Sequence, residues 1–129
     1  MGISDANFPT RQDGATYHCQ TKPGQVANSI ITVGDPARLV KIAAHLTDTC
    51  TIKSSRGFNT ISGTYKNTRV SVISIGMGSG MMDMMIREVR AVTSGPLAIV
   101  RFGSCGGVAV DAKVGMIAVA SHGIMVSRF

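Results

Sequence analysis

Short β-branched runs alternate along the chain with segments whose hydrophobic residues recur at helical spacing. Ser29–Val33, SIITV, has the length and composition of a buried strand, and a glycine follows it. The next segment begins with Asp35, a good N-cap, and with Pro36, which fits the first helical position. Its hydrophobic residues keep helical spacing as far as Leu46. The pattern predicts a strand followed directly by a helix.

The middle of the chain predicts a hairpin and a second helix. Two β-rich runs, residues 59–65 and 69–75, are joined by the turn residues 66–68. A glycine loop, GMGSG, follows, and the hydrophobic positions of 82–93 again have helical spacing. A Gly-Pro pair then ends the helix.

Two more hydrophobic strands are predicted at 98–102 and 116–120, on either side of a second glycine loop, GSCGG. Strands that alternate with helices are the signature of parallel α/β units. We therefore expect an α/β fold with a mixed, largely parallel central sheet flanked by helices. Residues 1–28 are polar and irregular and are expected to form an N-terminal arm, and 29–129 to belong to one α/β domain. No closing helix follows the last predicted strand, so we expect a truncated domain.

The charge balance favours an anionic ligand. Lys and Arg number 13 against 7 Asp and Glu, which gives a net charge of +6. The basic residues are scattered, and the chain has four Phe, two Tyr and no Trp. It therefore lacks the basic stripe with stacking rings that RNA and single-strand binders use, and no nucleic-acid partner is expected.

The cysteines and the hydropathy pattern indicate the compartment. Three cysteines lie far apart and form no CxxC pair, which argues against a disulfide framework and against a zinc site. A reducing cytosol suits them. The N-terminus has no signal peptide, and no hydrophobic run is long enough to span a bilayer. We expect a cytoplasmic protein without a membrane partner.

Three loops follow predicted strands: GDPAR, GMGSG and RFGSCGG. Parallel sheets place their ligand sites at these carboxyl ends. The second loop is not a dinucleotide fingerprint, because Met81 replaces the third glycine of GxGxxG and no acidic residue follows about 20 residues later. The chain contains no GxxxxGK[ST] motif either. The remaining interpretation of these loops is a site for an anion, which requires neither motif.

Arg38 falls in the first turn of the first predicted helix, where the helix dipole disfavours a cation unless an anion is bound. Gly34 lets the backbone approach a ligand closely, and the helix start offers N–H donors. These features predict a phosphate site. The alternative is that Arg38 lies on the solvated face with Lys41 and His45.

Arg101 ends a hydrophobic strand, where a charge is costly to bury without a partner. Ser104 adds a hydroxyl, and the neighbouring glycines free backbone N–H groups to turn inward. Arginines at the ends of two parallel strands can converge on one phosphate. The alternative is an ion pair between Arg101 and a carboxylate such as Asp35 or Glu88.

The segments VGDPAR, SRGFNT and VRFGSCGG resemble, in order and spacing, motifs of the nucleoside phosphorylase family, which includes uridine phosphorylases and hexameric purine nucleoside phosphorylases. The resemblance implies a phosphorylase-like three-layer fold. It also implies phosphorolysis of a nucleoside, uridine rather than a purine nucleoside, to free base and ribose 1-phosphate. Inorganic phosphate is then the co-substrate, no cofactor or metal is needed, and the enzyme is a homodimer or a higher homo-oligomer.

The same resemblance implies roles for individual residues. The phosphate ligands are Gly34, Arg38, Arg101 and Ser104, of which Arg101 is the catalytic residue and Ser104 also approaches the ribose. Two residues are lent to the partner subunit: Arg56 to its phosphate and His18 to its ribose. Met77 falls in a ribose-lining loop.

Several of these positions keep an alternative. His18 can be an exposed arm histidine, and Met77 can simply pack. Gly57 stands where uridine phosphorylases often have a glutamate that binds an interface cation. Cys105 is expected to be a small packed thiol and not a nucleophile, because no histidine lies near it in sequence.

Two rival functions remain. A nucleosidase would use water in place of phosphate, and the paired arginines argue against it. A catalytically silent phosphate-binding or dimerisation module is the other. In the family, the residues that stabilise the leaving base come later in the chain, so the 129 residues alone are expected to be inactive.

Overall fold

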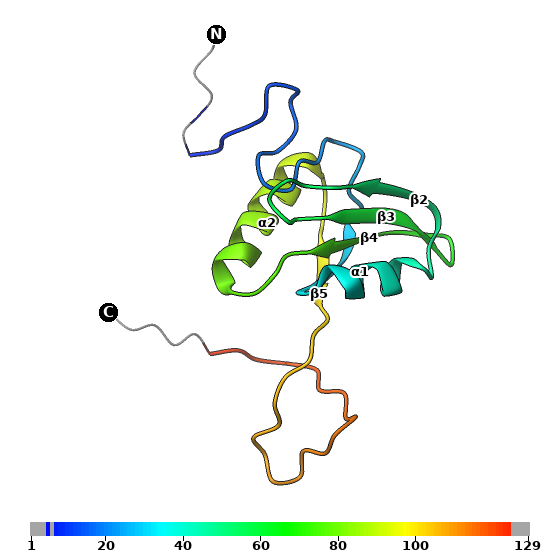
Figure 1. Cartoon of the computed structure of the whole chain (residues 1–129), viewed down its shortest axis with the longest axis vertical. Helices are drawn as coiled ribbons and strands as arrows, with labels where there is room; N and C mark the ends of the chain where they lie inside the picture. Colours follow the sequence, from blue (N-terminus) through cyan, green and yellow to red (C-terminus); the bar gives the residue numbers. More distant parts are fainter. Residues whose placement is uncertain (1–4, 6, 125–129) are drawn as a thin grey trace.

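The computed structural model describes residue 5 and residues 7–124, which form one mixed sheet with two helices (Figure 1). In chain order, the elements are β1 (Ser29–Val33), α1 (Pro36–Ala43), β2 (Thr47–Ile52), β3 (Thr60–Tyr65), β4 (Thr68–Ser74), α2 (Ser79–Val92) and β5 (Ala98–Arg101). The ends of the two predicted regions, residues 1–4 and 6 of the arm and 125–129 of the domain, lie outside the described residues.

The strand order in the sheet is β2-β3-β4-β1-β5. β1 pairs in parallel with both β4 and β5, whereas β3 is antiparallel to β4 and β2 is antiparallel to β3. The predicted mixed sheet is therefore confirmed. Because β1, β4 and β5 run in the same direction, their carboxyl ends and the three glycine-containing loops lie at one edge of the sheet.

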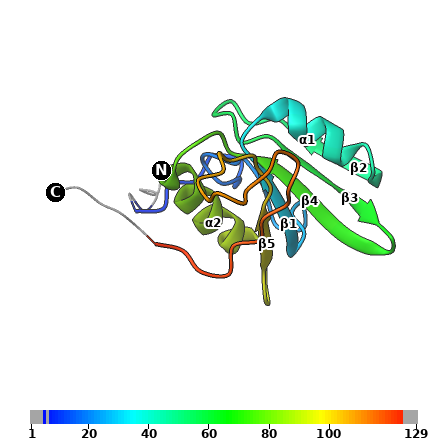
Figure 2. The same ribbon diagram turned by 90° about the horizontal axis from the view of Figure 1, so that it is seen from below.

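The two helices cover opposite faces of the sheet (Figure 2). On one face, Leu39 of α1 packs with Val33 and Val72. On the other face, α2 closes a larger hydrophobic cluster, to which the N-terminal arm also contributes. Its buried members are Cys19, Val26, Ile30, Phe58, Ile73, Ile75, Met85, Val89 and Val92. The three layers follow from side chains that alternate between the faces along each strand.

Local sequence explains the first helix and the hairpin. The Asp35 carboxylate accepts a hydrogen bond from the Ala37 N–H at 2.8 Å and caps α1, as predicted. Lys66 and Asn67 form the two-residue turn between β3 and β4 and have φ angles of 43° and 64°. Two positive φ values match the type I′ turn, whose twist suits a hairpin.

The sequence pattern did not predict β2. Its sequence, TDTCTI, has no hydrophobic stripe, and five of its six residues are exposed. The strand forms because the β3 backbone offers a free edge, and its register shifts between Thr47 and Cys50, where Asp48 has φ of 50°. Gly63 of β3 fits beneath this irregularity, since a Cβ there would lie 2.7 Å from the Thr47 carbonyl oxygen.

The prediction of a strand at 116–120 was wrong. After β5 the chain leaves the sheet, and residues 102–124 contain neither helix nor strand and are all exposed (Figure 1). A strand needs a hydrogen-bonded neighbour, and none of the described strands pairs with this segment. The segment has the hydrophobic composition of a strand, but it pairs with none of the described strands.

Candidate functional site

A hollow of about 400 Å³ opens at the carboxyl edge of the parallel strands. It is lined by Gly34, Asp35, Arg38, Gly76, Met77, Arg101, Gly103 and Ser104. These residues come from all three loops that follow the parallel strands. The structure thus brings together five residues predicted from sequence, namely Gly34, Arg38, Met77, Arg101 and Ser104.

Backbone hydrogen bonds hold the first two loops against each other. The Ile75 N–H donates to the Val33 carbonyl at 2.9 Å, and the Gly76 N–H donates to the Gly34 carbonyl at 3.1 Å. Gly34 is needed here for space: a Cβ at this position would lie 3.2 Å from the Gly76 oxygen and 3.4 Å from Arg101 Nη2. The loops can approach this closely only because position 34 has no side chain.

Arg101 reaches across the carboxyl end of the sheet. Its Nη2 donates to the Gly76 carbonyl oxygen at 3.2 Å, and its side chain is exposed on the hollow. Among the described residues no carboxylate forms a salt bridge with Arg101, so the ion-pair alternative with Asp35 or Glu88 is wrong. The guanidinium keeps donors free for an anion.

Arg38 lines the hollow from α1, whereas Lys41 and His45 are exposed and lie outside the lining. The expected N–H donors of the first turn are occupied by Asp35. Its carboxylate accepts from the Ala37 N–H, and its carbonyl accepts from the Arg38 N–H at 3.1 Å. These N–H groups are therefore not free for an anion, whereas the side chains of Arg38 and Arg101 line the hollow.

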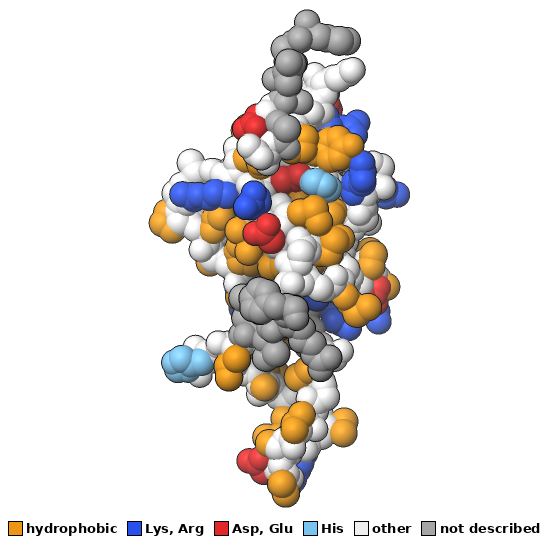
Figure 3. Space-filling view, turned by 90° about the vertical axis from the view of Figure 1, so that its left-hand side faces the viewer, with side chains coloured by type: hydrophobic (Ala, Val, Ile, Leu, Met, Phe, Trp, Pro, Cys, Tyr) orange, Lys and Arg blue, Asp and Glu red, His pale blue; other side chains and the backbone are white. Residues whose placement is uncertain are grey.

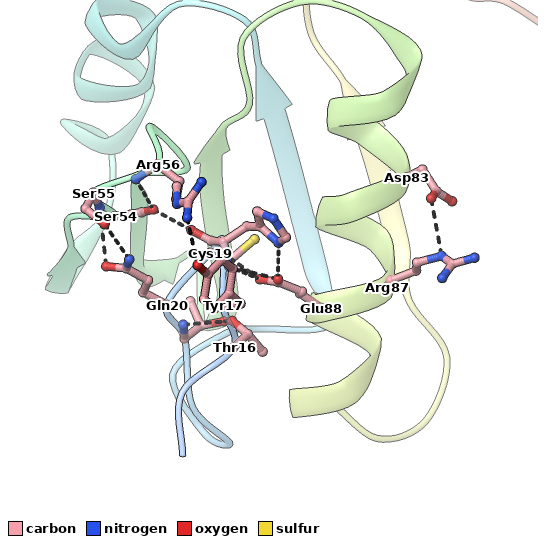
Figure 4. A network of polar contacts seen from close by, with 12 residues as sticks. Thr16, Tyr17, Cys19, Gln20, Ser54, Ser55, Arg56, Asp83, Arg87 and Glu88 are labelled. Atoms are coloured by element: carbon pink, nitrogen blue, oxygen red, sulfur yellow. Dashed lines mark hydrogen bonds and ion pairs between the residues drawn. The ribbon is translucent and has the colours of Figure 1, made fainter. Parts of the chain in front are cut away.

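His18 and Arg56 do not line the hollow but lie together on a second surface. Arg56 Nη2 donates to the Tyr17 hydroxyl at 2.8 Å, and its guanidinium stands 4.9 Å from the centre of the Tyr17 ring. The Ser54 hydroxyl donates to the His18 carbonyl and accepts from the Arg56 N–H at 3.0 Å. These contacts join the arm to the SRGF loop (Figure 4).

Glu88 of α2 is the partner of His18, and sequence reasoning did not assign it this role. Its carboxylate lies 2.6 Å from His18 Nδ1. Burial raises the pKa of Glu88. Hydrogen bonds from the Cys19 and His18 N–H groups and from the His18 ring together have a larger, opposite effect, so that the pKa lies below its ordinary value. One signal was available: Glu88 falls on the buried face of α2, between Met85 and Val89, where a carboxylate requires a partner.

The structure also shows the surroundings of Cys105, Met77 and Gly57. Cys105 is exposed, so its interpretation as a packed thiol was wrong: it lies in the segment that leaves the sheet. Met77 is 88% exposed beside the hollow, so it does not pack in the core. Gly57 has φ of 86°, a conformation that disfavours any other residue, including glutamate.

The described residues hold no group of three or more His, Cys, Asp or Glu side chains arranged to bind a metal ion. No helix in this part of the chain combines the length and the hydropathy needed to cross a membrane.

Burial and the nearby Glu88 carboxylate raise the pKa of the Cys19 thiol, which makes it a poor nucleophile.

Comparisons with known proteins identify relatives of the chain. The chain is 31% identical over 119 residues to the uridine phosphorylase of Thermococcus kodakarensis, a match that covers 92% of this chain and 42% of the relative. It is 36% identical over 100 residues to a DeoD-type purine nucleoside phosphorylase of Bacillus thuringiensis, covering 77% of this chain and 42% of the relative. The chain thus spans less than half the length of these curated relatives.

Solved structures give the same result. A structure from work on two uridine phosphorylases of the oomycete Phytophthora capsici superposes with a TM-score of 0.79 at 43% identity, covering 83% of this chain and 37% of that one. A Trypanosoma brucei nucleoside phosphorylase with uridine phosphorylase activity superposes with a TM-score of 0.61 at 34% identity, covering 66% of this chain and 27% of that one. The profile described as "Phosphorylase superfamily" matches residues 28–126, and the chain belongs to this superfamily.

Proposed function

We propose that the enzyme containing this chain catalyses phosphorolysis of a nucleoside, with uridine as the preferred substrate, and that this chain supplies its phosphate site. The observation that carries the proposal is that Arg38 and Arg101, from different elements, line one hollow with Gly34 and Ser104. Two guanidinium groups and a hydroxyl suit a phosphate dianion, because arginine donates paired hydrogen bonds to phosphate oxygens. Uridine is preferred here because two of the four relatives described are uridine phosphorylases and a third has that activity.

The chemistry requires placement and charge more than a nucleophilic side chain. A phosphate oxygen attacks C1′ of the ribose, the bond from C1′ to the base nitrogen breaks, and the base leaves with the electron pair. Arg38 and Arg101 hold the phosphate where it can attack, and Ser104 and Met77 border the space for the sugar. As C1′ becomes positively charged, the phosphate that the arginines hold beside it stabilises that charge. Inorganic phosphate is the only co-substrate, and no cofactor or metal takes part.

We also propose that the enzyme is a homodimer or larger homo-oligomer. His18 is partly exposed, Arg56 is exposed, and the two lie together outside the lining of their own hollow, which suits residues that complete a partner's site. We also propose the division of the chain into an arm at 1–28 and an α/β domain at 29–129. Free thiols at Cys50 and Cys105, both exposed, support a cytoplasmic location.

The test is to replace the matching part of the Thermococcus kodakarensis uridine phosphorylase with this chain and to measure uracil release from uridine. We expect release that depends on phosphate and is abolished by Arg101→Ala. Release without phosphate would identify a nucleosidase. No release from a folded chimera that binds phosphate would favour a silent phosphate-binding module, and the 129 residues alone are expected to behave in this way.

A further inference from the structure

Glu88 is a buried carboxylate on the hydrophobic face of α2. Its side chain is 4% exposed, and its helix neighbours Met85 and Val89 are fully buried. A charge in such a place destabilises the fold unless hydrogen bonds replace its lost water. The structure provides them from a segment about 70 positions earlier in the chain.

Both carboxylate oxygens are used by the arm. Glu88 Oε1 accepts from the His18 N–H at 2.8 Å and lies 2.6 Å from His18 Nδ1. Glu88 Oε2 accepts from the Cys19 N–H at 2.6 Å and from the backbone N–H of His18 at 3.1 Å. Figure 4 shows Glu88 pointing from α2 to the arm beside Cys19 and Tyr17. Glu88 therefore fixes the backbone and the side chain of His18 at once.

The contact with Nδ1 determines where the imidazole carries its proton. An ionised carboxylate has only acceptors, so the short contact requires a proton on Nδ1. In the neutral ring the other nitrogen, Nε2, is then an acceptor. The hydrogen bonds from two backbone N–H groups favour the ionised form of Glu88, which keeps this arrangement in place.

The surroundings of the ring hold its plane. The Tyr17 and Phe58 rings meet the imidazole edge-on, with centroids 5.2 and 6.2 Å away. The His18 side chain is 26% exposed, and among the described residues its Nε2 makes no hydrogen bond. His18 and Arg56 are neighbours, because the Ser54 hydroxyl contacts the backbone of both. Figure 3 shows one face of the molecule, on which hydrophobic and charged side chains are mixed.

We propose that Glu88 is a positioning residue that holds His18 as the Nδ1–H tautomer and so presents Nε2 as an acceptor to a hydroxyl group brought by a second molecule. This proposal rests on the proposed function for the identity of that hydroxyl, which would belong to the ribose bound by the partner subunit. The tautomer itself is a property of this chain alone.

The experiment measures the His18 tautomer in the ¹⁵N-labelled 129-residue chain by long-range ¹H–¹⁵N correlation spectra of the neutral imidazole. We expect the Nδ1–H form to dominate. In Glu88→Gln, the amide has a donor that can face Nδ1, so the balance should move to the Nε2–H form. Val89→Ala, which removes buried volume one residue further along α2, is the matched control and should leave the tautomer unchanged.

An unmodified chain that carries the Nε2–H form would overturn the proposal, and this measurement needs no variant to fold. So would a folded Glu88→Gln chain with an unchanged tautomer, or a Val89→Ala chain that shifts as much as Glu88→Gln. Failure of the proposed function is seen separately, as an unmodified chain that does not bind phosphate in calorimetry. That result would not change the conclusion drawn from the tautomer measurement.

Discussion

Arg101 and Arg38 approach the same hollow from opposite faces of the sheet. Arg101 pairs in register with Thr32, which shares its face with Ile30, and Ile30 packs in the cluster beneath α2. Arg38 belongs to α1, which covers the other face. Both side chains nevertheless line the hollow at the carboxyl edge. The two cations thus border the hollow from both sides of the sheet edge.

This relationship predicts that each arginine contributes to phosphate binding. Arg101→Ala and Arg38→Ala should each weaken phosphate binding to the chain by about 10- to 150-fold, the loss of one charge-assisted contact of roughly 1.5–3 kcal/mol. Titration calorimetry at fixed ionic strength measures it. Arg87→Ala removes the same charge from an exposed site on α2 and should change the affinity little. Equal losses in all three variants would indicate an effect of net charge only.

Gly34→Ala should weaken phosphate binding without unfolding the chain. The added methyl would meet the Gly76 oxygen at 3.2 Å and Arg101 Nη2 at 3.4 Å, so it displaces the guanidinium from its position. Gly80→Ala is the matched control, because a Cβ at Gly80 meets nothing within 4 Å. Gly80 lies in α2, so this control should raise the free energy of unfolding by about 0.5 kcal/mol. Wild-type affinity in Gly34→Ala would show that the close approach is not needed.

The arrangement of the hollow could be predicted because it depends on local signals and on one rule of topology. A β-branched run, an N-cap followed by proline, and a glycine after each strand defined β1, α1 and the loops. Parallel strands then bring the loops to one edge, whatever their separation in sequence. This rule brings Arg38 and Arg101 together without any pattern that links the two residues directly, and the family resemblance predicts the same grouping.

Other features could not be read from the sequence because they depend on tertiary partners. β2 has almost no hydrophobic pattern and forms through pairing with β3. The strand predicted at 116–120 has the pattern and lacks the pairing. The contact between His18 and Glu88 joins residues 70 positions apart, and no local signal links them. Only the polar residue on the buried face of α2 indicated that a partner existed.

Glu88 should make the stability of the chain depend on pH in the acid range. The pKa of Glu88 in the folded chain lies below its ordinary value of 4.5, so the unfolded chain takes up a proton first as the pH falls. The stabilisation from Glu88 is therefore fully present above about pH 5.5 and is lost as the pH falls through the folded pKa. Urea unfolding at a series of pH values should show a steeper decline for the unmodified chain than for Glu88→Gln. Parallel curves would contradict this assignment.

Gly57 should resist substitution. Its φ of 86° is a left-handed conformation that a Cβ disfavours, although nothing lies within 4 Å of the added atom. Gly57→Ala should therefore lower the free energy of unfolding by about 1 kcal/mol through the backbone alone. Gly103→Ala, where no positive φ and no neighbour within 4 Å is found, is the control and should have little effect. Unchanged stability in Gly57→Ala would show that the SRGF loop tolerates another conformation.

Arg56 should act in the site of a partner subunit. In the chimeric enzyme described above, Arg56→Ala leaves the subunit's own hollow intact. Arg101→Ala disrupts the hollow but leaves Arg56 available to the site of the partner subunit. Each variant alone should be nearly inactive. Random mixing into dimers should restore about a quarter of the unmodified activity, because about half of the dimers are hybrids and each hybrid has one complete site. Absence of recovery, with hybrids verified by mass spectrometry, would place Arg56 in the site of its own subunit or in no site.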